Sequence, residues 1–100
     1  LETPPWLDAA CAYRAAGAGQ VGGDTFDVVA CPGGSYAVII ADVCGHGIES
    51  AGRAAAIRHA LRAQLIAGAD PSAALEVADR ALRQLHPGTF DLASAAIVGP

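Results

Sequence analysis

Apolar residues in the first half of the chain gather in two short runs that have the length of β-strands. Residues 25–31 (TFDVVAC) and residues 36–41 (YAVIIA) are rich in β-branched and aromatic side chains, and the turn sequence PGGS separates them. Such runs joined by Pro and Gly are typical of a β-hairpin. The second run is apolar throughout, so we expect it to be buried on both faces of a sheet.

The spacing of apolar residues then changes to the period of a helix. Ile57, Leu61 and Leu65 lie on one stripe and predict a long helix over about residues 48–67. Gly68 follows this stretch directly, in the position of a helix stop. Before the hairpin, residues 7–15 fit either a strand or a short helix, because their pattern alone does not decide between the two.

A second helix and a third strand complete the pattern. Asp70 has the position of an N-cap and Pro71 that of the first helical residue. Apolar residues at steps of three and four predict that this helix runs to about Leu85: Leu75, Ala78, Leu82 and Leu85. Residues 90–98 have the composition of a strand. The order predicts an α+β fold, with two helices on one face of a mainly antiparallel sheet.

Composition narrows the class of protein. A chain of 100 residues holds one small domain at most. Its net charge is −4 without any run of Lys or Arg, which argues against nucleic-acid binding. The longest apolar stretch is too short to span a bilayer, and no signal-like segment opens the chain. Three cysteines, Cys11, Cys31 and Cys44, fit neither a zinc site nor a disulfide framework, so we expect a reduced, cytoplasmic protein.

Two acidic residues stand at the ends of the predicted hairpin strands, and each has glycines nearby. Asp24 follows Gly22 and Gly23, and Asp42 ends the apolar strand just before the sequence VCGHG. Strands paired in a hairpin would bring both acids to one end of the sheet, and clustered carboxylates suit a hard cation such as Mg²⁺ or Mn²⁺. Acids beside glycine also favour ordinary turns. The residues alone leave both interpretations open.

Two segments taken together resemble a known family. Residues 21–27 (VGGDTFD) and residues 41–47 (ADVCGHG) are similar to the paired motifs of the protein phosphatase 2C-like (PPM) superfamily, and in particular of its bacterial stage II sporulation protein E branch. Tyr13 and Arg14 match the residues that usually precede the first motif in this family. Thr25 in the first motif and Cys44 in the second depart from the family pattern. An aromatic residue is usual at the position of Thr25, and Ser is usual at the position of Cys44. Residues 90–94 (FDLAS) depart mildly from a usual Phe-x-Thr-Ala pattern.

The resemblance implies an α/β/β/α sandwich with antiparallel sheets and a centre of two Mn²⁺ or Mg²⁺ ions. Metal-bound water then hydrolyses phosphoserine or phosphothreonine. By position, Asp42 resembles the carboxylate that bridges both metals, the carbonyl of Val43 a backbone ligand, and Asp24 a second acidic ligand. Supporting roles fall to residues around them: Gly23, Asp27, Gly45, His46 and Gly47. No residue is assigned as a catalytic acid or base.

Other side chains have simpler interpretations. For Asp27 a structural or supporting role is favoured over metal ligation, and for His46 a role in the turn or beside the substrate is open. Cys44 is either an activated thiol or, as we favour, a small filler. The helical arginines are expected on solvated faces: Arg53, Arg58, Arg62, Arg80 and Arg83. His59 and His86 are expected to be ordinary surface residues.

Three functions follow in order of preference. In the first, residues 1–100 are the N-terminal part of a single phosphatase domain that acts on a phosphorylated anti-sigma-factor antagonist, and the isolated piece is inactive because later strands supply further metal-binding aspartates. In the second, the chain is a non-catalytic regulatory or dimerisation module of the same fold. In the third, Gly45 to Gly47 bind phosphate at a helix N-terminus, although the Lys of a P-loop is missing.

Overall fold

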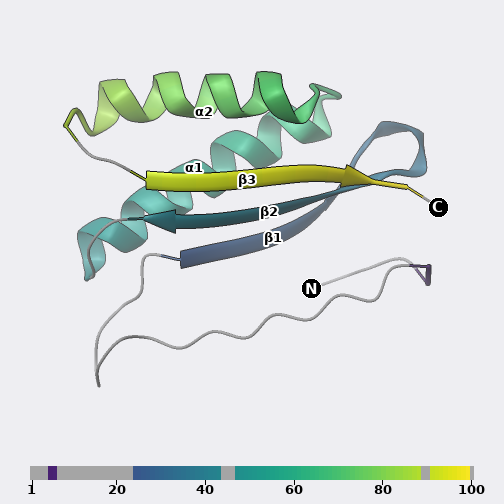
Figure 1. Ribbon diagram of the computed structural model, residues 1–100, viewed down its shortest axis with the longest axis horizontal. Helices are drawn as coiled ribbons and strands as arrows, with labels where there is room; N and C mark the ends of the chain where they lie inside the picture. The colour runs from purple at the N-terminus through teal and green to yellow at the C-terminus, as the bar shows by residue number, and fades with distance from the viewer. Residues whose placement is uncertain (1–4, 7–23, 44–46, 89–90, 100) are drawn as a thin grey trace.

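The computed structural model describes residues 5–6, 24–43, 47–88 and 91–99, which form one sheet covered on one face by two helices (Figure 1). The strands are β1 (Asp24–Ala30), β2 (Tyr36–Val43) and β3 (Asp91–Val98), and the helices are α1 (Ile48–Ile66) and α2 (Pro71–Leu85). The strand order is β1-β2-β3, with both pairs antiparallel. This arrangement confirms the predicted α+β class. The second sheet of a sandwich stays a prediction.

The hairpin forms where the turn chemistry predicts it. A short 3₁₀ turn spans Pro32–Gly34, and the backbone N–H of Cys31 donates to the carbonyl of Ser35 over 2.9 Å. Both glycines of the turn have φ of 81°, a conformation that glycine adopts without steric cost. At the end of the sheet near Asp42 the strands run beyond the predicted limits, because β1 already includes Asp24 and β2 continues through Val43. At its other end β1 stops at Ala30, one residue before the predicted limit.

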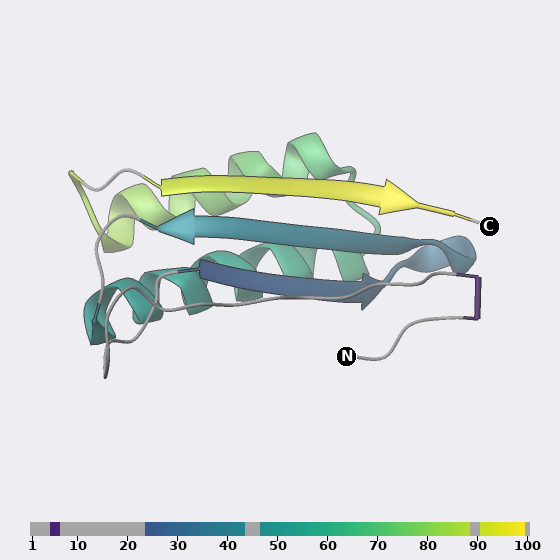
Figure 2. The same cartoon turned by 60° about the horizontal axis from the view of Figure 1, so that its bottom comes forward.

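Only one face of β2 is buried among the described residues, so the prediction of burial on both faces is wrong. Successive side chains of a strand point to opposite faces, and the helices cover one of these faces. On the covered face every β2 residue is buried: Ala37, Ile39, Ala41 and Val43. On the other face Ile40 keeps 54% of its surface exposed. We call this second side the open face of the sheet; Figure 2 shows both helices on the opposite side.

The predicted apolar stripe of α1 forms the centre of the core. Ile57, Leu61 and Leu65 are almost completely buried against β2 and α2. The helix ends at Ile66, and Gly68 follows with φ of 97°, which explains why glycine occupies the predicted stop position.

The second helix begins where its cap predicts. The Oδ1 atom of Asp70 accepts a hydrogen bond from the backbone N–H of Ala73 over 2.8 Å, and Pro71 is the first helical residue. Ala74 and Ala78 are buried on its inner side. Leu85, predicted on the apolar stripe, is instead exposed, because the helix ends there and the chain turns back into β3.

Near the N-terminus, the ring of Trp6 meets that of Tyr36 edge to face, with ring centroids 5.7 Å apart. The predicted element at residues 7–15 and the glycine-rich turn at residues 17–23 lie outside the described residues. Neither helix in the described part of the chain has the length and apolar character needed to cross a membrane.

Candidate functional site

The two candidate acidic ligands are direct partners in the hairpin. Asp24 is the first residue of β1, and it stands opposite Asp42, the penultimate residue of β2, in the strand register. Opposed residues of an antiparallel pair share a face of the sheet, with Cα atoms about 4.5–5.5 Å apart. The hairpin therefore brings both positions to the same face and the same end of the sheet, as the strand pattern predicts.

That shared face is the open one. Asp42 is exposed, whereas its neighbours Ala41 and Val43 are buried on the side of the helices. Three strand ends and one helix start meet at this end of the molecule, because β1 and β3 begin there, β2 ends there and α1 starts there (Figure 1). The carboxylate of Asp42 thus stands on a strand whose other face packs in the core, and it is exposed at the surface.

The chemistry of these donors suits a hard divalent cation but supplies only part of its ligands. Mg²⁺ and Mn²⁺ prefer carboxylate and carbonyl oxygens, and each binds about six of them, water included. Asp24, Asp42 and the carbonyl of Val43 are of the right type. Within the described ranges, however, no group of three or more His, Cys, Asp or Glu residues is placed to hold a metal ion. The described residues therefore fit one side of a metal site.

Several residues of the two motifs are not among those that the structure describes. Gly23, Cys44, Gly45 and His46 lie outside the described residues. Gly47 is described, and it is the N-cap of α1 with φ of 95°, a conformation unfavourable for other residues. Its carbonyl accepts hydrogen bonds from the backbone N–H of Ala51 and from the hydroxyl of Ser50, at 3.1 and 3.0 Å. Gly47 therefore starts the helix that follows the motif.

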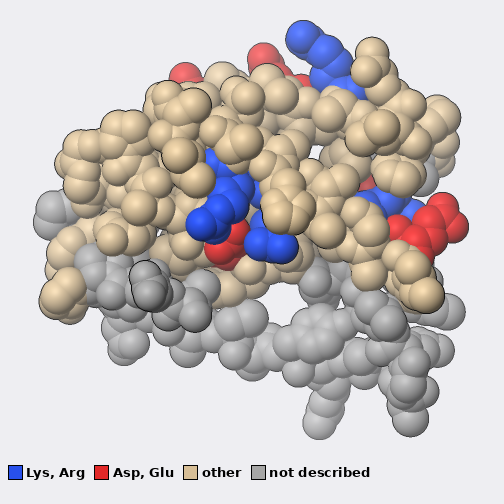
Figure 3. All heavy atoms as spheres, turned by 180° about the vertical axis from the view of Figure 1, so that it is seen from behind, with Lys and Arg blue, Asp and Glu red and all other residues tan. Residues whose placement is uncertain are grey.

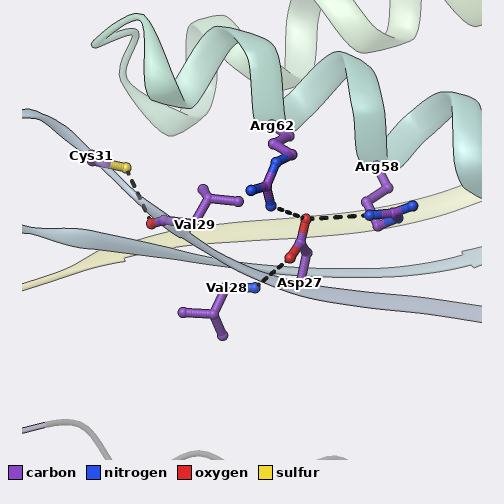
Figure 4. A network of polar contacts seen from close by, with 6 residues as sticks. All are labelled: Asp27, Val28, Val29, Cys31, Arg58 and Arg62. Atoms are coloured by element: carbon purple, nitrogen blue, oxygen red, sulfur yellow. Dashed lines mark hydrogen bonds and ion pairs between the residues drawn. The ribbon is translucent and has the colours of Figure 1, made fainter. Parts of the chain in front are cut away.

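Asp27 lies on the face opposite to Asp42, and its contacts tie β1 to α1. Figure 4 shows its carboxylate pointing toward the helix. Its Oδ2 atom accepts from Nη1 of Arg62 at 2.8 Å and lies 3.6 Å from Nη1 of Arg58, while Oδ1 accepts from the backbone N–H of Val28 at 2.9 Å. These contacts favour a structural role for Asp27 over metal ligation.

The prediction that the helical arginines lie on solvated faces is wrong for Arg53. Only 6% of Arg53 is exposed, and its Nε atom lies 3.4 Å from Oδ2 of Asp91. A sequence signal for this burial exists, since Arg53 precedes Ile57 by four residues and so extends the apolar stripe of α1 by one step. A charged residue on such a stripe indicates a buried partner.

The remaining arginines differ in exposure. Arg58 and Arg62 are half-buried beside Asp27, whereas Arg80 and Arg83 are exposed, as predicted. Seen from behind, the surface is mostly uncharged, with a small group of basic atoms around acidic ones (Figure 3). No extended basic surface covers this view.

The described cysteine, Cys31, is a poor candidate for a reactive thiol. Burial raises the pKa of the Cys31 thiol, and a weaker opposing effect comes from a backbone hydrogen bond of Ala37. The Sγ atom of Cys31 lies 3.7 Å from the carbonyl oxygen of Val29. A thiol with a raised pKa is a poor nucleophile at neutral pH, so Cys31 acts as a small packing residue. His59 is exposed, as predicted.

Comparison with known proteins places this arrangement in a family. The family model described as "Stage II sporulation protein E (SpoIIE)" matches residues 32–99, a range that includes Asp42 and Val43 and begins after Asp24. The chain is also similar to the crystal structure of the RsbU and RsbW domains of Rv1364c from Mycobacterium tuberculosis, with 34% sequence identity and a TM-score of 0.71. That similarity covers 79% of this chain but only 22% of the other.

The family match includes the second motif, and the solved relative shares the fold. The chain spans 22% of the length of the solved relative, so it corresponds to a limited part of that protein. The chain belongs to the stage II sporulation protein E family, and its fold is part of a SpoIIE-type domain of the PPM superfamily.

Proposed function

We propose that this chain carries part of the active site of a metal-dependent protein serine/threonine phosphatase. The observation that carries the proposal is the pairing of Asp24 with Asp42 on the open face of the sheet, in a member of the SpoIIE family. The two acidic positions share one face at the end of the sheet where α1 also begins. They would supply two of the carboxylate ligands that a divalent-metal centre needs.

The residues of this chain would hold and orient the metal ions. Asp42 would contribute its carboxylate, Val43 its backbone carbonyl, and Asp24 a second carboxylate. Two bound Mn²⁺ or Mg²⁺ ions would supply activation of water and neutralisation of phosphoryl charge. Because Asp42 stands between two buried residues of β2, its position is held by the core. Asp27 would have a structural role, because it keeps β1 against α1 near the middle of the strand and lies away from the candidate ligands.

Membership of the SpoIIE family supports a proposal for the substrate class. We propose a phosphorylated serine or threonine on a bacterial signalling regulator in the cytoplasm, with an anti-sigma-factor antagonist as the preferred candidate. The exposure of Asp42 supports a protein substrate, because a phosphoserine on a folded partner can reach only a site that is open at the surface.

A non-catalytic dimerisation module is the second candidate. It is favoured by the exposed apolar side chains on β2 and β3, where Ile40 and Leu92 keep 54% and 61% of their surface exposed. Apolar residues on a sheet face favour association with another surface. This candidate predicts dimers whose formation does not depend on Mn²⁺, together with no hydrolysis of phosphoserine by the full-length protein.

The substitution Asp42→Asn in the full-length protein tests the phosphatase proposal. It keeps the size of the side chain and removes the charge that would hold the cation, so Mn²⁺-dependent hydrolysis of a phosphoserine peptide should be abolished. Asp79→Asn is the matched control, because Asp79 is an exposed aspartate on α2 whose partner is Arg83 on the same helix. Retained activity with an unchanged Mn²⁺ dependence in Asp42→Asn would sink the assignment.

A further inference from the structure

We propose that Arg53 and Asp91 form a positioning clamp for the end of β2 that presents Asp42 and Val43, an inference that rests on the proposed function. The two side chains are 7% and 8% exposed, and Nε of Arg53 lies 3.4 Å from Oδ2 of Asp91. The pair joins α1 to the first residue of β3. Neither motif contains either residue, and sequence analysis places Arg53 in solvent.

The clamp lies directly behind the candidate metal site. Asp91 is the register partner of Val43, and the next residue, Leu92, is the partner of Asp42. Asp91 and Val43 share the helix-covered face, whereas Asp42 is on the open face. Arg53 follows on α1, the helix that begins after the second motif. The clamp therefore joins the strand beside Asp42 to the helix after it.

A strand end needs such support to hold a ligand in place. Residues at the end of a strand open more easily than those in its centre, because fewer neighbours hold them. A metal ligand must stay close to its productive position, and residues that orient the ligands commonly affect metal affinity. The planar guanidinium of Arg53 constrains the direction of the carboxylate it meets, which a flexible apolar side chain would not do.

Stability alone is a weak reason for this pair. A buried ion pair often contributes no more than well-packed apolar residues would, because both charges must be removed from water. The position of Arg53 on the stripe of Ile57 would ordinarily suit an apolar residue. Glu49 adds little, since it is 81% exposed and lies 3.7 Å from Arg53. The pair is therefore best explained by the geometry that it imposes.

The chain offers a matched comparison. Asp27 and Arg62 form another ion pair between α1 and the sheet, but Asp27 stands opposite Ile39, nearer the middle of β2. A variant that breaks this second pair disturbs the same helix and the same type of interaction. Because this variant acts away from the end of β2, a comparison with it distinguishes a local effect on the metal site from a general loss of stability.

The experiment compares Arg53→Met, Asp91→Asn and the double variant in the full-length protein, with Arg62→Met as control. Each single variant removes one charge of the pair, whereas the double variant removes both charges. We expect Mn²⁺ affinity, measured by calorimetry without substrate, to fall about 10–100-fold in all three clamp variants. The thermal stability of the double variant should return toward that of the wild type, while its Mn²⁺ affinity should not.

Amide hydrogen exchange of the metal-free protein gives a second, independent readout. Exchange should become faster at residues 41–43 and 91–93 in the double variant, and stay unchanged at residues 36–38 at the other end of β2. The control Arg62→Met should leave residues 41–43 and the Mn²⁺ affinity near the wild-type values.

Three results would overturn the clamp: recovery of Mn²⁺ affinity together with stability in the double variant, an equal loss of affinity in Arg62→Met, or unchanged exchange at residues 41–43. If the wild-type protein binds no Mn²⁺, the proposed function fails instead. Hydrogen exchange then still decides whether Arg53 and Asp91 hold the end of β2.

Discussion

Asp27 puts a carboxylate on the helix-facing side of β1, where an apolar residue would ordinarily pack. It is 8% exposed. One carboxylate oxygen accepts a hydrogen bond from the backbone of its own strand, and the other pairs with the arginines of α1. Arg62 and Arg58 are only half-buried, so their charged ends remain partly in water. One acidic residue thereby holds β1 to α1, three positions after the candidate ligand Asp24.

Replacement of Asp27 by Asn should destabilise the protein by about 1–3 kcal/mol, because hydrogen bonds to a charged group are lost and two arginines lose their counter-charge. The amide oxygen of Asn can still accept from Val28, so the backbone contact is kept. Urea unfolding measures the change. Asp79→Asn, which breaks an exposed pair with Arg83, should cost no more than about 0.5 kcal/mol. Equal costs for the two variants would contradict the role given to Asp27.

At the scale of elements, α1 and α2 owe their limits to different local signals. Gly47 and Gly68 bound α1 through backbone conformations that suit glycine, with φ of 95° and 97°. Helix α2 begins with a side-chain cap from Asp70 and with Pro71, whose missing N–H is not needed in the first turn. Both helices can therefore be located from sequence, whereas the faces that they present depend on packing.

Replacement of Asp70 by Ala should lower the free energy of unfolding by about 1 kcal/mol, the usual cost of losing an N-cap side chain. The lost interaction is the 2.8 Å hydrogen bond from the N–H of Ala73. Urea unfolding of the full-length protein gives the value. Ser72→Ala is the control, since Ser72 is exposed in the same turn and Ala favours a helix. A loss of stability in Ser72→Ala as large as in Asp70→Ala would argue against the cap.

On the scale of the whole molecule, the described residues form a sheet with one covered face and one open face. Among the described residues, strands β1 and β3 are the edges of this sheet, and β2 is paired on both sides. Unpaired strand edges and exposed apolar residues favour association with other chains. The candidate metal-binding position Asp42 lies on the open face and is exposed there.

The 100-residue chain studied alone should show no phosphatase turnover and only weak Mn²⁺ binding. Two acidic positions and one carbonyl are too few ligands for a tight site, and the described residues hold no cluster of three. It should also self-associate through its open face and edges, which sedimentation at several concentrations would detect. Calorimetric titration with Mn²⁺ and a phosphopeptide assay complete the test. Tight stoichiometric binding with turnover would mean that two acids suffice or that a second copy supplies the rest.

The features that the sequence determined by itself are those that depend on residues close to one another along the chain. The Pro-Gly turn, the four-residue stripe of α1, the Asp70 cap and the two motifs act within a few positions, so strand, helix and family could be recognised from them. The opposition of Asp24 and Asp42 also follows, because a short turn sets the register of a hairpin.

Tertiary structure alone decided which faces are covered and which partners the buried charges have. An apolar run such as that of β2 does not reveal whether one or two layers pack on it, so Ile40 was expected to be buried and is exposed. The partners of Arg53 and Asp27 lie 38 and 35 positions away along the chain. Burial of a charge depends on a partner brought close by the fold, and no local pattern encodes that distance.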